Sequence, residues 1–195
     1  MPRNSLVLWI DLETNHNDVF TNEILEIFIQ YASCFSCNSA PISEFYSLVV
    51  PESSLTKTSS REAFIQSLGL SEWCNNVFQT NGLLNDLYDS ETKNTINNNV
   101  KQNLDSWLAY LVDSANVKCF VFAGKNIHYD MTVINRVFGD VLKKYPIAKH
   151  TYDISTTYYI HRANGGNDIS IPSTHRAYAD VISTRNLNSL LLGYV

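Results

Sequence analysis

The sequence has no excess of positive charge. Its 14 lysine and arginine residues are outnumbered by 19 aspartate and glutamate residues, which gives a formal net charge of −5 and a pI of about 5.4. A protein that binds long duplex DNA through its surface charge typically has a pI above roughly 9. Any nucleic acid that this chain handles should therefore be short, or be held through metal ions rather than a basic surface.

Cysteine is scarce, and long apolar runs are absent. Of four cysteines, Cys34 and Cys37 form a close pair, but no second Cys or His pair at zinc spacing accompanies them. The apolar run 6–10 is too short for a signal peptide or a membrane span, and it leads directly into Asp11. We therefore expect reduced thiols, an intracellular, cytoplasmic setting and no membrane partner.

The composition is otherwise that of one globular domain. The chain has 195 residues, of which 45% are hydrophobic and 17% charged, and it contains no internal repeat or long linker. Apolar runs predict strands at 6–10, 24–35, 45–50, 118–123 and 152–154. Apolar residues at helical spacing predict helices within 61–87, 100–111, 131–142 and 177–192. This order predicts an α/β fold, with a mixed five-stranded sheet flanked by helices.

Two carboxylates lie at the end of the first predicted strand. Asp11 and Glu13 are two residues apart, so they project from the same face of the strand. Side by side they repel each other, and a hard cation such as magnesium or manganese relieves that repulsion. An exposed polar pair without a function is the alternative interpretation of these two residues alone.

Three further residues that can bind a metal ion or move a proton lie at the ends of predicted elements later in the chain. Asp130 follows the strand 118–123 and opens a helix, where it could also simply complement the helix dipole. His175 and Asp180 lie about one turn apart at the start of the last helix. The alternative interpretation is that Ser173 or Thr174 caps this helix and that His175 and Asp180 are polar residues without a function. Each signal alone is weak. Together they place four acids and one imidazole at element ends.

The joint pattern resembles the three motifs of the DEDD 3′→5′ exonuclease superfamily, in its His-containing branch. The matching motifs are D-x-E at Asp11, N-x2-Y-D ending at Asp130 and H-x4-D from His175. The resemblance implies a ribonuclease-H-like fold over residues 1–195, as a single exonuclease domain. It also implies phosphodiester hydrolysis to nucleoside 5′-monophosphates with two Mg²⁺ or Mn²⁺ ions.

The same chemistry assigns a role to each residue. Asp11, Glu13 and Asp180 would hold the metal that activates the attacking water. Asp11 would bridge to the second metal, which Asp130 supports directly or through water. His175 would take the proton of that water, because imidazole changes protonation near neutral pH.

Over nearly the whole chain the sequence is similar to oligoribonuclease. The similar segments are 8–13, 24–27, 72–74 with 82–83, 153–156 and 175–177. The resemblance implies short RNA substrates and a homodimer, and we expect substrate contacts from Trp73, Asn126, His150 and Ser155. Trp73 could stack on a base, although a core position is the slightly favoured prediction. An exposed Phe78 would suit the dimer interface.

Several positions depart from the oligoribonuclease pattern. Asn17 stands where that family has a leucine wedge, and the pair Lys149 and His150 replaces its Tyr-Arg pair. Only Ser155 keeps the family residue in the pocket that caps the 5′ phosphate. We therefore expect a 5′ end that is held more loosely, with longer oligonucleotides accepted. A single-strand DNA exonuclease and an inactive nucleotide-binding module are the alternative functions.

Overall fold

The computed structural model describes residues 5–32, 43–55, 60–90, 94–115, 117–170 and 173–193. Within these ranges one sheet has the strand order β3-β2-β1-β4-β5. Its strands are β1 (Ser5–Thr14), β2 (Ile24–Ala32), β3 (Ser43–Leu48), β4 (Cys119–Gly124) and β5 (Tyr152–Asp153). β1 pairs antiparallel with β2 and parallel with β4, so the predicted mixed five-stranded sheet is confirmed.

Helices account for most of the remaining described chain. The α-helices are α1 (Arg61–Ser67), α2 (Glu72–Thr80), α3 (Leu83–Asp89), α4 (Lys101–Ala115), α5 (Ile127–Leu142), α6 (Ile154–Ala163) and α7 (Ala177–Leu192). A short 3-10 turn, η1 (Glu52–Ser54), follows β3, and a π-helical turn, η2 (Ile96–Val100), leads into α4. Among the described residues, no helix combines the length and apolar character needed to cross a membrane.

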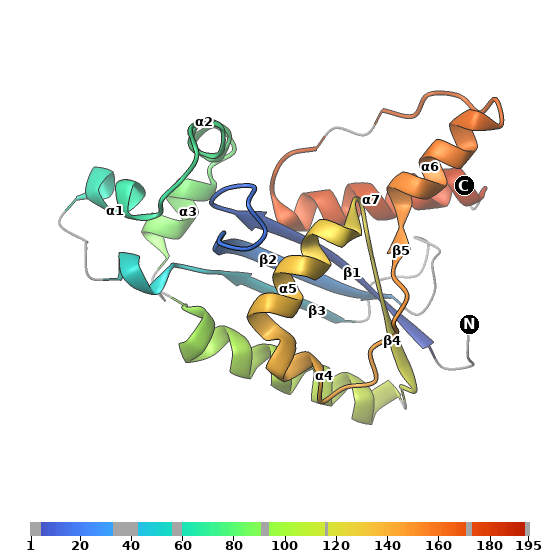
Figure 1. The fold of residues 1–195 in the computed structure, drawn as a ribbon, viewed down its shortest axis with the longest axis horizontal. Coiled ribbons are helices and arrows are strands. Elements are labelled where there is room, and N and C mark those ends of the chain that lie inside the picture. The colour runs from blue at the N-terminus through green and yellow to red at the C-terminus, as the bar shows by residue number, and fades with distance from the viewer. Residues whose placement is uncertain are drawn as a thin grey trace.

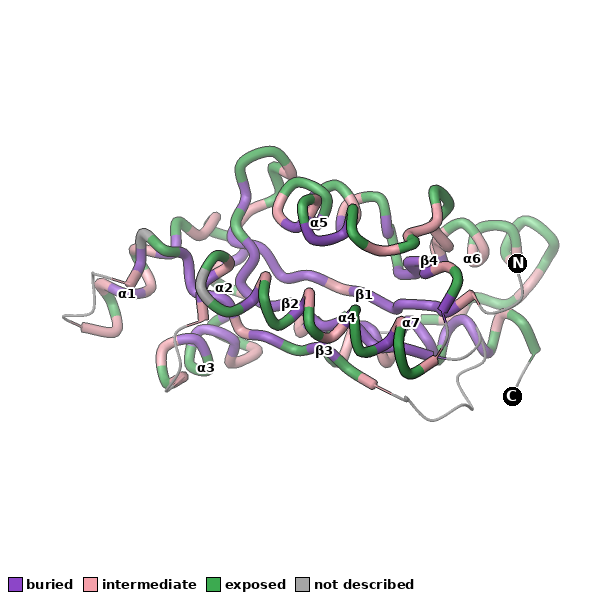
Figure 2. Tube along the Cα trace, turned by 90° about the horizontal axis from the view of Figure 1, so that it is seen from below, coloured by how far each residue is buried: buried purple, intermediate pink, exposed green. Residues whose placement is uncertain are grey.

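Strand β1 is central because its side chains are apolar on both faces. Leu8 and Ile10 belong to a core cluster that α4 and α5 complete on one face of the sheet. Val7 and Trp9 belong to a second cluster, which α6 and α7 complete on the other face. The tube of β1 and β2 is accordingly coloured as buried along most of its length (Figure 2).

Helices α1 to α3 form a separate group beyond the carboxyl end of β1, where α7 begins (Figure 1). The sequence predicts helical structure over 61–87, and the structure divides this stretch into three short helices. Gly69 (φ 63°) and Gly82 (φ 85°) interrupt it, because each adopts the left-handed conformation that a continuing helix cannot accommodate. The expectation that Phe78 is exposed is wrong: it is 1% exposed and packs within this group.

Other boundaries differ by a few residues. Strand β2 covers the predicted strand to Ala32, and the rest of that prediction, like Cys34 and Cys37, lies outside the described residues. Strand β5 stops at Asp153, whose carboxylate accepts a hydrogen bond from the Ser155 amide at 2.8 Å and so caps α6. The sequence analysis did not anticipate helix α6.

Candidate active site

The site is built on the carboxyl end of β1. Asp11 and Glu13 continue the face that carries Val7 and Trp9, so both carboxylates point to the α7 side of the sheet. Glu13 is 7% exposed and lies opposite Glu26 of β2 in the antiparallel register. Acidic groups therefore meet in a part of the sheet that water reaches poorly.

Asp130 joins these residues from the opposite side of β1. It lies in the first turn of α5 and is 4% exposed. Its carboxylate accepts a hydrogen bond from the backbone N–H of Leu12 at 3.0 Å, which ties α5 to the strand between the two other acids. Asn126, in the left-handed conformation (φ 53°), makes the sharp turn from β4 into α5 that permits this approach.

The loop before α7 brings in the remaining two residues. The Asp180 carboxylate accepts hydrogen bonds from the backbone N–H of Thr174 at 2.8 Å and of His175 at 3.2 Å, and from the hydroxyl of Ser173. Capping by Ser173 and Thr174, the alternative role considered for this segment, is thus replaced by a carboxylate that organises the loop. Donor atoms of Glu13, His175 and Asp180 lie within 4.8 Å of one another.

Burial and repulsion raise the pKa of three of these carboxyl groups. The pKa of Glu13 rises from 4.5 to about 8, through burial first and then the charges of Asp180, Glu26 and Asp130. Burial is also the main reason that the pKa of Asp130 rises from 3.8 to about 8. The pKa of Asp11 is well above its usual value of 3.8, because of burial and then the neighbouring carboxylates. The site would bind positive charge strongly.

The donor set fits a hard divalent cation. Carboxylate oxygens dominate it, a single imidazole adjoins them, and none of the five residues offers a thiolate. Magnesium and manganese prefer such oxygen-rich sites and keep open positions for phosphate oxygens and water. A cation would also relieve the repulsion that raises the carboxyl pKa values.

A cleft of about 520 Å³ opens over these residues. Asp11, Glu13, His175 and Asp180 all line it, whereas Asp130 does not and lies beneath, on the Leu12 backbone. The exposed residue Lys125 lines the side next to α5. The cleft has room for a nucleotide beside the acidic cluster.

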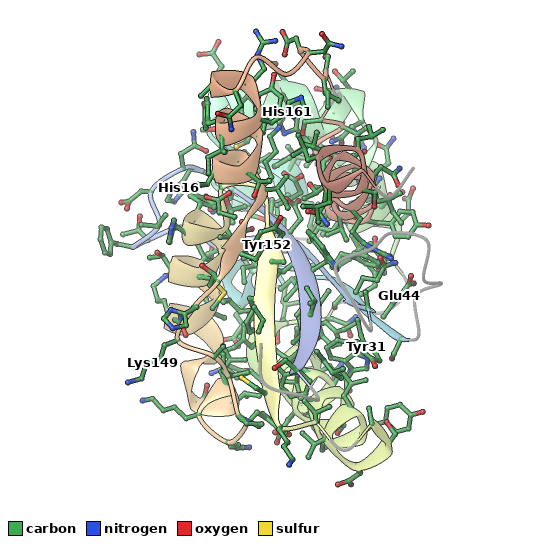
Figure 3. The ribbon with its side chains drawn as sticks, turned by 90° about the vertical axis from the view of Figure 1, so that its right-hand side faces the viewer. His16, Tyr31, Glu44, Lys149, Tyr152 and His161 are labelled. Atoms are coloured by element: carbon green, nitrogen blue, oxygen red, sulfur yellow. The ribbon has the colours of Figure 1, made fainter. Side chains whose placement is uncertain are left out.

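The four predicted substrate contacts are placed unequally. Asn126 lines the cleft, and its side-chain oxygen accepts a hydrogen bond from the Ser155 hydroxyl at 2.9 Å. His150 is exposed and does not line the cleft. Its neighbour Lys149 extends into solvent beside α5 (Figure 3). Lys149 and His150, which replace the Tyr-Arg pair of oligoribonuclease, therefore do not bring positive charge into the cleft.

The slightly favoured prediction of a core position for Trp73 is wrong. Its side chain is 51% exposed, and its ring meets the His175 ring edge-on, with centroids 5.0 Å apart and an interplanar angle of 88°. The indole therefore offers an exposed surface next to the proposed general base. Base stacking, the other role considered for Trp73, is compatible with this position.

Residues that connect the site to its surroundings were not among the sequence predictions. Tyr158 lines the cleft and donates a hydrogen bond to Asp168. Glu26 accepts hydrogen bonds from the Arg176 guanidinium at 3.0 Å and from the Ala177 N–H at 2.8 Å. A glutamate within an apolar strand was the available signal, because an acid buried there requires a partner.

Comparisons with known proteins find similarity in fold. No family model matches the chain, and no curated protein matches it. Among solved structures, the nuclease domain of 3′hExo, a DEDDh family member bound to rAMP, has a TM-score of 0.54 and 16% identity, over 98% of this chain and 94% of that one.

Two further solved structures are similar. Exonuclease I of E. coli, in complex with a 5cy-dA13 oligonucleotide, has a TM-score of 0.54 and 14% identity over 97% of this chain. Cell-death related nuclease 4 (CRN-4) has a TM-score of 0.52 and 14% identity, also over 97% of this chain. The chain spans 40% of the exonuclease I structure and 64% of CRN-4. The predicted ribonuclease-H-like α/β fold is therefore confirmed, and these three nuclease structures share it.

Proposed function

We propose that the protein is a divalent-metal-dependent 3′→5′ exonuclease that shortens single-stranded oligonucleotides and releases nucleoside 5′-monophosphates. The observation that carries this proposal is the meeting of Asp11, Glu13, Asp130, His175 and Asp180 at the carboxyl end of β1. These five residues come from three separate parts of the chain. A fold found in other nucleases brings them together.

Each residue has a distinct task in the proposed reaction. Asp11, Glu13, Asp130 and Asp180 would hold two divalent cations, which would supply activation of a water and stabilisation of the negative charge on the leaving oxygen. The His175 imidazole accepts the proton of the attacking water as its oxygen bonds to phosphorus. The 3′ oxygen of the shortened chain leaves, and the released nucleotide keeps the phosphate at its 5′ position.

The cleft also indicates how the substrate is held. Lys125, which lines the cleft, contacts a phosphate oxygen as a point charge, and the exposed indole of Trp73, which lies against His175 outside the cleft lining, stacks on a base. Asn126 and Ser155 offer polar groups toward the 5′ side. Since His150 does not line the cleft and Lys149 extends away from it (Figure 3), these two residues do not supply the positive charge of the Tyr-Arg pair on this side. The proposed substrates therefore include oligonucleotides longer than the dinucleotides that the oligoribonuclease resemblance implies.

RNA is the proposed substrate, on the strength of the oligoribonuclease-like segments in the sequence. The solved structures do not decide between sugars, since one of them holds rAMP and another a DNA oligonucleotide. A single-strand DNA exonuclease thus remains the second candidate. An inactive nucleotide-binding module is the third, but such a module has no need of an imidazole beside paired carboxylates.

The assembly state and setting complete the proposal. The oligoribonuclease resemblance favours a cytoplasmic homodimer, although the buried position of Phe78 removes the residue first expected at the interface. Light scattering during size-exclusion chromatography would measure the mass of the particle directly. A mass of one 22.1 kDa chain would exclude the dimer.

The decisive experiment is a time course on 5′-labelled RNA and DNA of two to seven nucleotides, with Mn²⁺, Mg²⁺ or EDTA. We expect metal-dependent shortening from the 3′ end, with comparable rates across the length series. Asp180→Asn should abolish it, and His175→Ala should reduce it strongly while leaving a residual single-turnover rate. Asp113→Asn, which changes an exposed acid of α4 far from the cleft, is the matched control and should retain full activity.

Each outcome has a direct meaning. A steep loss of rate beyond two nucleotides would contradict the loosely held 5′ end and restore the dinucleotide preference. Full activity of Asp180→Asn would refute the assignment of the site. No shortening with any metal or substrate would favour the nucleotide-binding module instead.

A further inference from the structure

His175 has an unusual backbone conformation. Its φ angle is 52°, in the left-handed region that residues with a side chain rarely adopt. Such a conformation is unfavourable for a residue with a side chain and persists only where the surroundings fix it. The backbone of the proposed general base must therefore be held in place by specific contacts.

Asn81 supplies contacts of this kind. It follows the last residue of α2, and its side-chain amide donates hydrogen bonds to the carbonyl oxygens of His175 at 2.6 Å and Thr174 at 3.1 Å. Its side-chain oxygen accepts a hydrogen bond from the Leu83 N–H at 3.0 Å, which fixes the amide orientation. One asparagine thus joins the turn between α2 and α3 to two successive peptides of the active-site loop.

Neighbouring contacts strengthen the same connection. The Arg176 guanidinium forms ion pairs with Glu26 of β2 at 3.0 Å and with Asp86 of α3 at 2.8 Å. It also donates a hydrogen bond to the Asn81 carbonyl oxygen at 3.5 Å. The Trp73 ring of α2 lies against the His175 ring. Helices α2 and α3 therefore contact the loop through its backbone, its imidazole and the next side chain.

We propose that Asn81 is a positioning residue for His175: its amide holds the loop in the left-handed conformation that directs the imidazole toward Glu13 and Asp180. This inference rests on the proposed function, because it assigns Asn81 a part in the same reaction. Asn81 does not line the cleft and touches no reacting atom, so it acts on the reaction through the loop that carries His175. Loss of the amide should misplace the base without weakening substrate binding.

Two substitutions test this role. Asn81→Asp keeps the oxygen that accepts from the Leu83 N–H and removes the donors to the two carbonyls, while Asn81→Ala removes both without adding charge. Because a displacement of about 1 Å can reduce a rate by about 100-fold, we expect both variants to lower kcat by about 10- to 100-fold with KM unchanged. Asn76→Ala, an exposed asparagine of the same helix, is the control and should match the wild type.

A double-mutant cycle separates positioning from a general structural effect. In a His175→Ala background, measured by single turnover with excess enzyme, Asn81→Asp should cause no further loss, since the group it positions is gone. An equal loss in both backgrounds would overturn the proposal. Wild-type kcat in Asn81→Asp would also overturn it.

A second measurement does not depend on activity. The His175 ring signals in an NMR spectrum, assigned by their disappearance in His175→Ala, should show the ring-current shift of Trp73. In Asn81→Asp they should move toward the shifts of an unstructured histidine, and in Asn76→Ala they should stay. Unchanged His175 signals in Asn81→Asp would refute the proposal. If wild-type protein degraded no substrate, the proposed function would fail, and these spectra would still decide the role of Asn81.

Discussion

Neutralising Glu13 should stabilise the metal-free protein, although it removes a residue of the proposed active site. The pKa of Glu13 is raised from 4.5 to about 8, so the folded state holds a proton more tightly than the unfolded state does. Between these two pH values the folded state binds more protons, and its stability falls as the pH rises. Below pH 4.5 Glu13 is protonated in both states, so its contribution to the free energy of unfolding is fully present, and it is lost as the pH rises toward 8.

The size of the effect follows from the two pKa values. For an isolated group the destabilisation amounts to about 1 kcal/mol at pH 5 and about 4 kcal/mol at pH 8. Asp11 and Asp130 compete for the same protons, so part of this free energy is shared with them. Glu13→Gln has nearly the same shape without the charge. We therefore expect it to raise the free energy of unfolding by about 2–4 kcal/mol at pH 8.

The assay is urea denaturation in EDTA at pH 5 and pH 8, for the wild type, Glu13→Gln and the control Asp113→Asn. The stabilisation by Glu13→Gln should be several times larger at pH 8 than at pH 5. Asp113 is exposed, so its variant should follow the wild-type pH dependence. A Glu13→Gln protein less stable than the wild type at pH 8 would show that the repulsion inferred at this site is absent.

Three further outcomes follow from the structure. Millimolar Mn²⁺ should raise the Tm of the wild type at pH 8 by preferential binding to the folded state, and Asp180→Asn should lose most of that shift in a fluorescence melt. Arg176→Ala leaves the buried Glu26 without its cation and should cost about 3 kcal/mol in urea denaturation, which Glu26→Gln in the same chain should partly restore. Gly82→Ala should lower stability by about 1 kcal/mol because of its positive φ, whereas Gly139→Ala, with open space inside α5, should not; equal effects would contradict the conformational argument.

The sequence was most informative where one local pattern determines the structure. The apolar run before Asp11 could only be a central strand, and a two-residue spacing placed Glu13 on the same face as Asp11. The last helix was predicted with its observed bounds, since Val181 and Leu187 lie on the sheet side and Gly193 ends it in the left-handed conformation. Such features depend on neighbours along the chain, which a single sequence displays.

Predictions that depended on the orientation of a helix were less successful. Trp73 and Phe78 are five residues apart, about 140° around a helix, so one buried face cannot readily take both. The sequence interpretation placed Trp73 inside and Phe78 outside, and the structure has the opposite arrangement. Which side of α2 meets its neighbours depends on the packing of α1 and α3, and residue spacing within α2 does not contain that information.

The placement of His150 and the role of Asn81 could not be predicted from the sequence for a different reason. His150 lies in the loop before a two-residue strand, where no periodicity fixes the direction of a side chain. Asn81 is an ordinary residue at a helix end, and its importance comes from a loop 94 residues away in sequence. Both depend on tertiary placement, which spacing along the chain does not specify.

The order of the site residues along the chain affects the protein during its synthesis. Asp11 and Glu13 leave the ribosome before their partners, because the hydrogen bond from Leu12 to Asp130 joins residues 118 positions apart, and His175 and Asp180 follow later still. A partly made chain thus holds an acidic pair without its base, and it cannot complete the proposed site. The proposed site would be assembled only when α7 packs on the sheet.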